Sequence, residues 1–160
     1  MNYIGIDPGE KGAIAFLNES GAVINYCLFK DISMKALLTD WSTTRVGQFT
    51  AVIEKLWGMP IRGCQANWSL GGNYKNWQFL LDLADVSYVE IPPTTWQKFI
   101  LHTSKKTSKE TKKLSLAYVN KRYPDIDLPQ RTIADRDSSS GVSDALCMAL
   151  YCRHLHLNVL

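Results

Sequence analysis

The chain begins with an apolar run, residues 2–6, that ends in Asp7 and is broken at once by Pro8 and Gly9. A second apolar run starts at Gly12, so the chain has to reverse within a tight turn and the two runs are predicted to form a hairpin. This hairpin places the Asp7 carboxylate at the end of one strand, beside the next. Taken alone, Asp7 is just as typical of a turn former next to Pro and Gly.

Two further acids stand at the ends of apolar segments. The strand-like run 48–53 leads into Glu54, and Asp144 lies in the first turn of an apolar helix predicted over residues 142–151. Each has a simpler explanation, since Glu54 could be a solvated strand end and Asp144 could be stabilised by the helix macrodipole. Three carboxylates in such positions together favour a site for a hard cation such as Mg²⁺.

Composition indicates one soluble globular domain spanning residues 1–160, because 46% of the residues are apolar and 21% are charged. The N-terminus has no signal-peptide pattern and no apolar stretch is long enough for a membrane span. We therefore expect a cytoplasmic protein that makes no membrane contact. Its four cysteines have no Cys-x-x-Cys spacing, which favours buried thiols over zinc ligands or disulfides.

Positive charge is concentrated in residues 98–122, which hold eight basic residues against one acid, whereas the whole chain has a net charge of +3. The basic residues are Lys98, Lys105, Lys106, Lys109, Lys112, Lys113, Lys121 and Arg122. Such a segment beside an acidic cluster suits a polyanionic substrate held over a metal site. The alternative is a solvated, Lys-rich loop and helix face.

The order of predicted elements indicates the fold class. Strands are expected at residues 2–7, 12–18, 22–29, 48–54 and 87–91, and helices at 33–41, 73–84, 92–100, 109–123 and 142–151. Residues 104–108 read as a polar hinge and 125–141 as a loop, and Thr94 or Thr95 is the expected cap of the short third helix. A meander of three strands followed by alternating helices and strands predicts an α/β fold with one mixed five-stranded sheet, which is the order of the ribonuclease H-like fold.

Six short segments carry a more specific resemblance. They are Ile4–Gly9, Val52–Glu54, Gly71–Tyr74, Ile91–Lys98, Lys112–Ala117 and Ser143–Ala149. In this order they resemble the RuvC-type Holliday-junction resolvases, in particular their compact phage-like branch. The similarity extends over nearly the whole chain.

The resemblance implies a Mg²⁺-dependent endodeoxyribonuclease that resolves four-way DNA junctions by paired nicks and acts as a homodimer. Asp7, Glu54 and Asp144 would be the metal ligands, holding two Mg²⁺ ions per site, with Mn²⁺ as a substitute. Lys112, or its neighbour Lys113, matches the lysine that approaches the scissile phosphate and offsets developing charge.

The sequence departs from this family pattern at one position. RuvC-like enzymes usually carry another acid three or four residues before the last one, where this chain has Gly141 and Ser140. Asp137, or Asp135, could supply the fourth ligand from the loop, the site could use three acids and water, or the change could inactivate the enzyme. We favour Asp137.

Candidates for DNA contact are Trp68, which lies among polar and Gly residues and could stack on an unpaired base, and Lys75, which could reach a phosphate. Tyr74 and Trp77 lie at helical spacing and are assigned to packing. The lysines at 105, 106, 109 and 113 are expected to contact the DNA backbone.

Three other functions were compared with the resolvase. A junction-binding module that does not cut follows from the missing fourth acid, and a less selective nuclease for branched DNA or RNA–DNA hybrids would have the same fold. Actin-like sugar kinases also open with a Gly-x-Asp turn, but they need two such domains, for which 160 residues leave no room.

Overall fold

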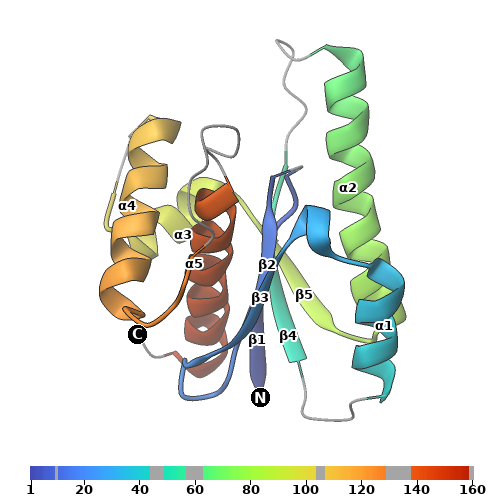
Figure 1. Ribbon diagram of the computed structural model, residues 1–160, viewed down its shortest axis with the longest axis horizontal. Helices are drawn as coiled ribbons and strands as arrows, with labels where there is room; N and C mark the ends of the chain where they lie inside the picture. The colour runs from blue at the N-terminus through green and yellow to red at the C-terminus, as the bar shows by residue number, and fades with distance from the viewer. Residues whose placement is uncertain (10, 44–48, 57–62, 104–106, 129–137, 159–160) are drawn as a thin grey trace.

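The computed structural model describes residues 1–9, 11–43, 49–56, 63–103, 107–128 and 138–158 (Figure 1). Within these ranges a five-stranded sheet has the strand order β3-β2-β1-β4-β5. The strands are β1 (Asn2–Asp7), β2 (Ala13–Leu17), β3 (Val23–Leu28), β4 (Phe49–Glu54) and β5 (Ser87–Ile91). Each lies within about one residue of its predicted bounds, because short apolar runs bounded by turn formers or polar residues mark the strands.

The sheet is mixed, as the sequence predicts. β1, β2 and β3 form an antiparallel meander in which Ile6 pairs with Ile14. β4 joins the other side of β1 in parallel, with Ile6 opposite Ile53, and β5 pairs in parallel with β4. Because β1, β4 and β5 run in the same direction, their carboxyl ends meet at one edge of the sheet.

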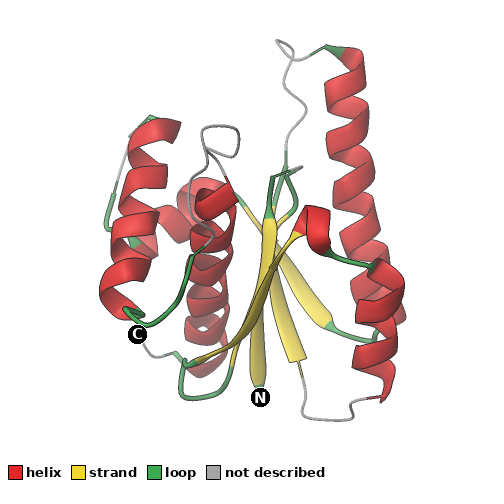
Figure 2. Ribbon diagram, viewed as in Figure 1, coloured by secondary structure: helices red, strands yellow, loops and turns green. Residues whose placement is uncertain are grey.

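Helices cover both faces of the sheet (Figures 1 and 2). Their bounds are α1 (Met34–Thr43), α2 (Cys64–Leu83), α3 (Pro93–Ile100), α4 (Ser108–Arg122) and α5 (Ser138–Leu157), with a short 3₁₀ turn at Phe29–Asp31. α1 and α2 lie on one face, and α3, α4 and α5 on the other. None of the described helices combines the length and the hydrophobicity that crossing a membrane requires.

α2 begins nine residues earlier than the predicted helix at 73–84. The prediction treated Gly71 and Gly72 as part of a loop, but glycine within a helix costs only about 1 kcal/mol relative to alanine. No proline interrupts residues 64–83, so the helix continues through both glycines. Its N-terminal end consequently extends beyond the edge of the sheet (Figure 1).

α5 also differs from its predicted bounds of 142–151, since it runs from Ser138 to Leu157. Asp144 is therefore the seventh residue of the helix rather than a residue of its first turn. A helix macrodipole acts mainly within the first turn. The explanation of Asp144 as a dipole-stabilising acid is thus wrong.

The starts of α3 and α4 show two more corrections. α3 has Pro92 as its N-cap and Pro93 at its first position, so neither Thr94 nor Thr95 caps it. The predicted polar hinge includes the cap of α4, because Thr107 and Glu110 form a capping box. The rest of that hinge, residues 104–106, lies outside the described residues.

The core has two parts, one on each face of the sheet. Ile4, Ile6 and Ile53 pack under α1 and α2 together with Trp77, which is fully buried as predicted. On the other face Tyr3, Val52 and Trp96 pack against α5, whose residues 145–149 have no exposed surface. Alternation along β1 therefore turns Tyr3, Gly5 and Asp7 toward α5.

Glycine allows α5 to approach the sheet with backbone against backbone. A Cβ atom at Gly5 would overlap the Ala145 carbonyl oxygen and the Ala149 nitrogen of α5. A Cβ atom at Gly141 would overlap the carbonyl oxygen of Lys11, in the turn between β1 and β2. α5 is therefore seated directly on β1 and on its hairpin turn.

We expect Gly141→Ala to lower the free energy of unfolding by about 1–3 kcal/mol, because the methyl group has to displace the hairpin backbone. Gly71→Ala is the matched control, since it makes the same change in a helix where no described atom beyond the adjacent turns of that helix lies within 4 Å of the new Cβ. That variant should gain up to about 1 kcal/mol from helix propensity. Urea unfolding followed by circular dichroism measures both, and a Gly141→Ala protein as stable as the parent would contradict the contact.

Candidate metal and nucleic-acid site

Asp7 and Glu54 lie side by side at the carboxyl edge of the sheet. Gly5 pairs with Val52 and Ile6 with Ile53, so the parallel register continued by one residue sets Asp7 beside Glu54. Asp7 is two residues after Gly5, and Glu54 is two residues after Val52. Because side chains alternate along a strand, both carboxylates share the face that α5 covers.

Asp144 comes to the same place from α5. It directly precedes Ala145, whose carbonyl oxygen lies against Gly5. Its Oδ1 atom is buried and has no hydrogen-bond partner among the described residues. Acids distant in the sequence, at positions 7, 54 and 144, are thus brought to one site by the contact between α5 and β1.

Burial and mutual repulsion hold these carboxyls above their ordinary pKa values. Burial, then the charge of Asp7, raises the pKa of Glu54 to about 7. Burial raises the pKa of Asp7, and burial followed by the charges of Asp7 and Glu54 raises that of Asp144. Lys112 acts in the opposite direction on the pKa of all three groups.

These shifts set how the stability of the cation-free protein depends on pH. A carboxyl whose pKa is raised by folding binds more protons when folded, so the unfolding free energy falls as pH rises. For Glu54 this stabilising contribution is complete below its ordinary pKa of 4.5 and is lost as pH rises through about 7. At neutral pH and above, the charged site therefore opposes folding unless a cation offsets it.

The chemistry of the site fits a divalent cation. Its donors are carboxylate oxygens, which Mg²⁺ and Mn²⁺ prefer, and the buried Oδ1 atom of Asp144 has no hydrogen-bond partner within the described ranges. As the side chains stand, no three His, Cys, Asp or Glu side chains in the described ranges converge closely enough to hold an ion. Direct coordination of one ion by Asp7, Glu54 and Asp144 therefore requires side-chain movement.

Lys112 reaches the acids from α4. A hydrogen bond of 3.1 Å between the buried hydroxyls of Ser115 and Ser143 joins α4 to α5 next to Asp144. Lys112 is half-buried one turn before Ser115, whereas Lys109 and Lys113 are exposed on the same helix. Lys105 and Lys106 lie outside the described residues.

Backbone occupies one of the two positions, 140 and 141, at which the family pattern would place a fourth acid. Gly141 precedes Asp144 by three residues in α5, and its contact with the Lys11 carbonyl leaves no room for a side chain. An acid at residue 141 would have to push α5 away from the hairpin. Asp135 and Asp137, the predicted alternatives, lie outside the described residues.

One site contact was missed by the sequence analysis. The indole Nε1 of Trp96 in α3 donates a hydrogen bond of 2.9 Å to Oε2 of Glu54. Trp96 belongs to the segment Ile91–Lys98 that was singled out for its resemblance, but no role was assigned to it. The available signal was its place in the first helix after β5, the strand that pairs with β4.

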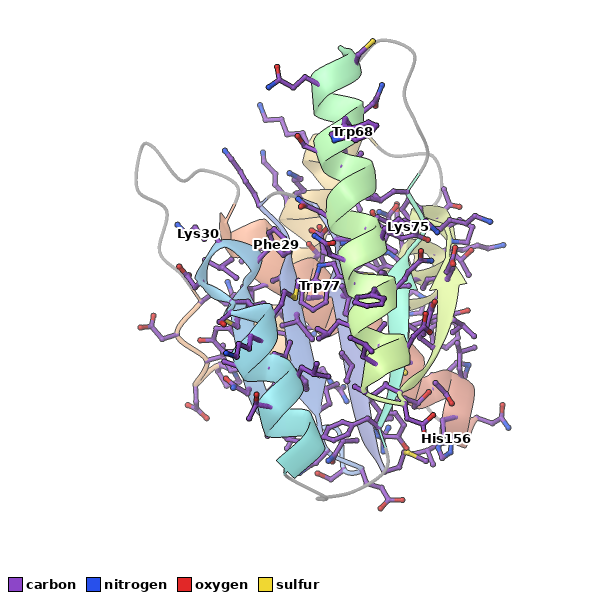
Figure 3. All side chains as sticks on the ribbon, turned by 90° about the vertical axis from the view of Figure 1, so that its right-hand side faces the viewer. Phe29, Lys30, Trp68, Lys75, Trp77 and His156 are labelled. Atoms are coloured by element: carbon purple, nitrogen blue, oxygen red, sulfur yellow. The ribbon has the colours of Figure 1, made fainter. Side chains whose placement is uncertain are left out.

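The two α2 candidates for DNA contact have different surroundings (Figure 3). Trp68 is 85% exposed near the projecting end of α2, so its indole is accessible for stacking. The Lys75 ammonium donates to Oε1 of Gln78 at 2.6 Å, and Gln78 in turn binds Glu90 on β5. Tyr74 is half-buried against the α2 side of the core and donates to the same Glu90 at 2.6 Å.

Comparisons with known proteins support the fold. No protein-family model and no curated protein matches the sequence. Among solved structures, Thermus thermophilus RuvC in complex with a Holliday junction substrate matches with a TM-score of 0.65 and 15% identity, over 98% of this chain and 96% of that one. A second T. thermophilus RuvC structure matches with a TM-score of 0.62 and 15% identity, over 99% and 97% of the two chains.

The likeness covers all of the layers described above. It shows that the chain has the fold of RuvC, a ribonuclease H-like fold with a mixed five-stranded sheet flanked by helices. The fold predicted from the order of elements is thereby confirmed.

Proposed function

We propose that this protein is a Mg²⁺-dependent endonuclease that resolves four-way DNA junctions by paired nicks, leaving 5′-phosphate and 3′-hydroxyl ends. The observation that carries the proposal is the gathering of Asp7, Glu54 and Asp144, with Lys112 acting on all three, at one edge of a RuvC-like sheet. The T. thermophilus protein of this fold was solved with a Holliday junction substrate.

Asp7, Glu54 and Asp144 would hold two Mg²⁺ ions, with Mn²⁺ as a substitute, and Asp137 is the proposed fourth ligand. Bound ions would supply a water nucleophile of lowered pKa and stabilise charge on the phosphoryl and leaving oxygens. The protein's own groups orient the reaction. Lys112, already electrostatically coupled to the acids, would offset charge that develops on the scissile phosphate.

DNA binding at an acidic site requires positive charge nearby. Lys109 and Lys113 are exposed on α4, the same helix that carries Lys112. With Lys105 and Lys106 in the preceding segment, they would track the phosphate backbone on either side of the scissile bond. The exposed Trp68 would stack on an unpaired base at the junction centre, and Lys75 would reach a phosphate if it exchanged its bond to Gln78.

A homodimer would account for paired nicks, because a two-fold axis sets two identical sites on opposed strands. α2 offers a surface for such pairing. Large apolar side chains are exposed along it, with Phe79 at 65% and Leu83, one turn later, at 54%. Exposed apolar residues grouped in this way are typical of protein interfaces.

A second candidate is favoured by Gly141, which leaves no room for an acid three residues before Asp144. On this account the protein binds junctions without cutting them. A less selective nuclease for branched DNA or RNA–DNA hybrids is the remaining variant of the same chemistry.

Cleavage of a labelled synthetic four-way junction tests the proposal, beside linear duplex and an RNA–DNA hybrid, in Mg²⁺, Mn²⁺ and EDTA. We expect paired nicks in the junction that require metal and fall more than about 100-fold in Asp7→Asn, which removes a metal ligand. Asp85→Asn is the matched control, because Asp85 is an exposed acid at φ 54°, a backbone conformation that Asn adopts readily.

The arms of the experiment separate the candidates. Tight junction binding without cutting in either metal would favour the binding module, and equal cutting of duplex or hybrid would favour the less selective nuclease. Neither binding nor cutting of any of these substrates would refute all three.

To test the dimer, we expect analytical ultracentrifugation to give the parent protein twice the monomer mass of 18.1 kDa. Phe79→Glu should instead be a monomer. A buried charge at a subunit interface is strongly unfavourable. Ile24→Glu is the control, since Ile24 is 53% exposed on β3, away from α2. A monomeric parent chain at the concentrations that cut junctions would contradict the dimer.

A further inference from the structure

We propose that Trp96 is a positioning residue of this site, which holds the Glu54 carboxylate in place through its indole N–H. The inference rests on the proposed function, in which Glu54 is a metal ligand. Trp96 does not touch the substrate or the ion, and its effect is carried by Glu54 alone.

The fold places the Trp96 ring with little freedom. β5 pairs with β4 so that Ile91 lies opposite Glu54, and the Lys55 N–H donates to the Ile91 carbonyl at 2.7 Å. α3 begins at Pro93, two residues after β5 ends, so its first turn is fixed next to Glu54. The ring itself is fully buried in the α5 side of the core, which prevents it from rotating away.

The hydrogen bond selects one oxygen of the carboxylate. An indole carries a single donor proton and no acceptor, so it can bind Oε2 of Glu54 at 2.9 Å and nothing else. Oε1 is left for another partner. A glutamate side chain has three rotatable bonds, and a bond from a rigid, buried ring removes most of that freedom before any ion arrives.

Trp77 indicates that the bond to Glu54 is not a general consequence of burying an indole. Both tryptophans are fully buried, and each packs on a different face of the sheet. The Nε1 atom of Trp77 has no hydrogen-bond partner among the described residues. Phenylalanine could fill either place in the core, but only at residue 96 would it remove a donor to a site carboxylate.

Mutation of a residue that hydrogen-bonds to a metal ligand typically lowers metal affinity or activity by about 10–100-fold. We therefore expect Trp96→Phe to weaken Mn²⁺ binding to the DNA-free protein by about 10–100-fold, measured by titration calorimetry. Trp77→Phe is the matched control, because it also replaces a fully buried indole with a phenyl ring. It should leave Mn²⁺ affinity within about 3-fold of the parent. Circular dichroism and urea unfolding establish that both variants are folded.

Cleavage kinetics separate positioning from a merely structural role. In Trp96→Phe the Mn²⁺ concentration for half-maximal junction cleavage should rise by the same factor as the Mn²⁺ dissociation constant, while the KM for DNA is unchanged. A global loss of packing would instead raise the KM for DNA as well. Mn²⁺ affinity equal to the parent's in a folded Trp96→Phe protein would overturn the proposal.

A measurement on the tryptophan itself keeps the test decisive if Trp96→Phe does not fold. In ¹⁵N-labelled parent protein the Trp96 indole resonance should shift on Mg²⁺ titration and in Glu54→Gln, whereas the Trp77 indole resonance should stay within its line width in both. A Trp96 resonance indifferent to Glu54→Gln would refute the hydrogen bond. Absence of any Mg²⁺ or Mn²⁺ binding by the parent would refute the proposed metal site instead, and with it the positioning role.

Discussion

The direct contact between α5 and β1 is the interaction on which the site depends. Gly5 has no side chain, so the Ala145 carbonyl of the helix rests against the strand backbone. Asp7 follows two residues later on the same strand face, and Asp144 precedes Ala145 by one residue. Any side chain at Gly5 would lift the helix and separate the two acids, whatever the chemistry of the acids themselves.

The same contact makes the site unfavourable for folding. It buries three carboxyls together: burial raises the pKa of each, and the charges of neighbouring acids raise the pKa of Glu54 and Asp144 further. Lys112 opposes this rise and Trp96 does so at Glu54, but neither cancels it. Functional sites commonly carry such a cost in stability, and a bound cation would remove it.

Much of this arrangement could be predicted from the sequence. The strands, the mixed sheet and the positions of Asp7 and Glu54 at strand ends follow from short apolar runs that end at turn formers or loops. The start of α5 could not be predicted, because Ser138–Ser140 and Gly141 have the composition of a loop. The Lys11 carbonyl packs against Gly141 and leaves no room for a Cβ atom there, and such a tertiary contact leaves no local pattern in the sequence.

The hydrogen bond between Trp96 and Glu54 could not be predicted from the sequence either, because it joins side chains that are 42 residues apart. The bond from the Lys75 ammonium to Gln78 within the same helix was likewise not predicted, and the phosphate contact proposed for this exposed lysine stays a prediction. Sequence patterns thus located the strand-end carboxylates, but the groups that orient them depend on packing between helices and sheet.

The central claim, that the clustered acids form a cation site, is tested most directly by urea unfolding of the parent and Asp7→Asn at pH 8. Asn can still accept the Gly9 N–H bond that Asp7 accepts at 3.0 Å, so the exchange removes charge with little change of shape. In EDTA we predict that Asp7→Asn is more stable than the parent by about 1–2 kcal/mol. Mn²⁺ should reverse that order by stabilising the parent alone. A parent more stable than Asp7→Asn in EDTA, or Mn²⁺ stabilising both proteins equally, would contradict the account.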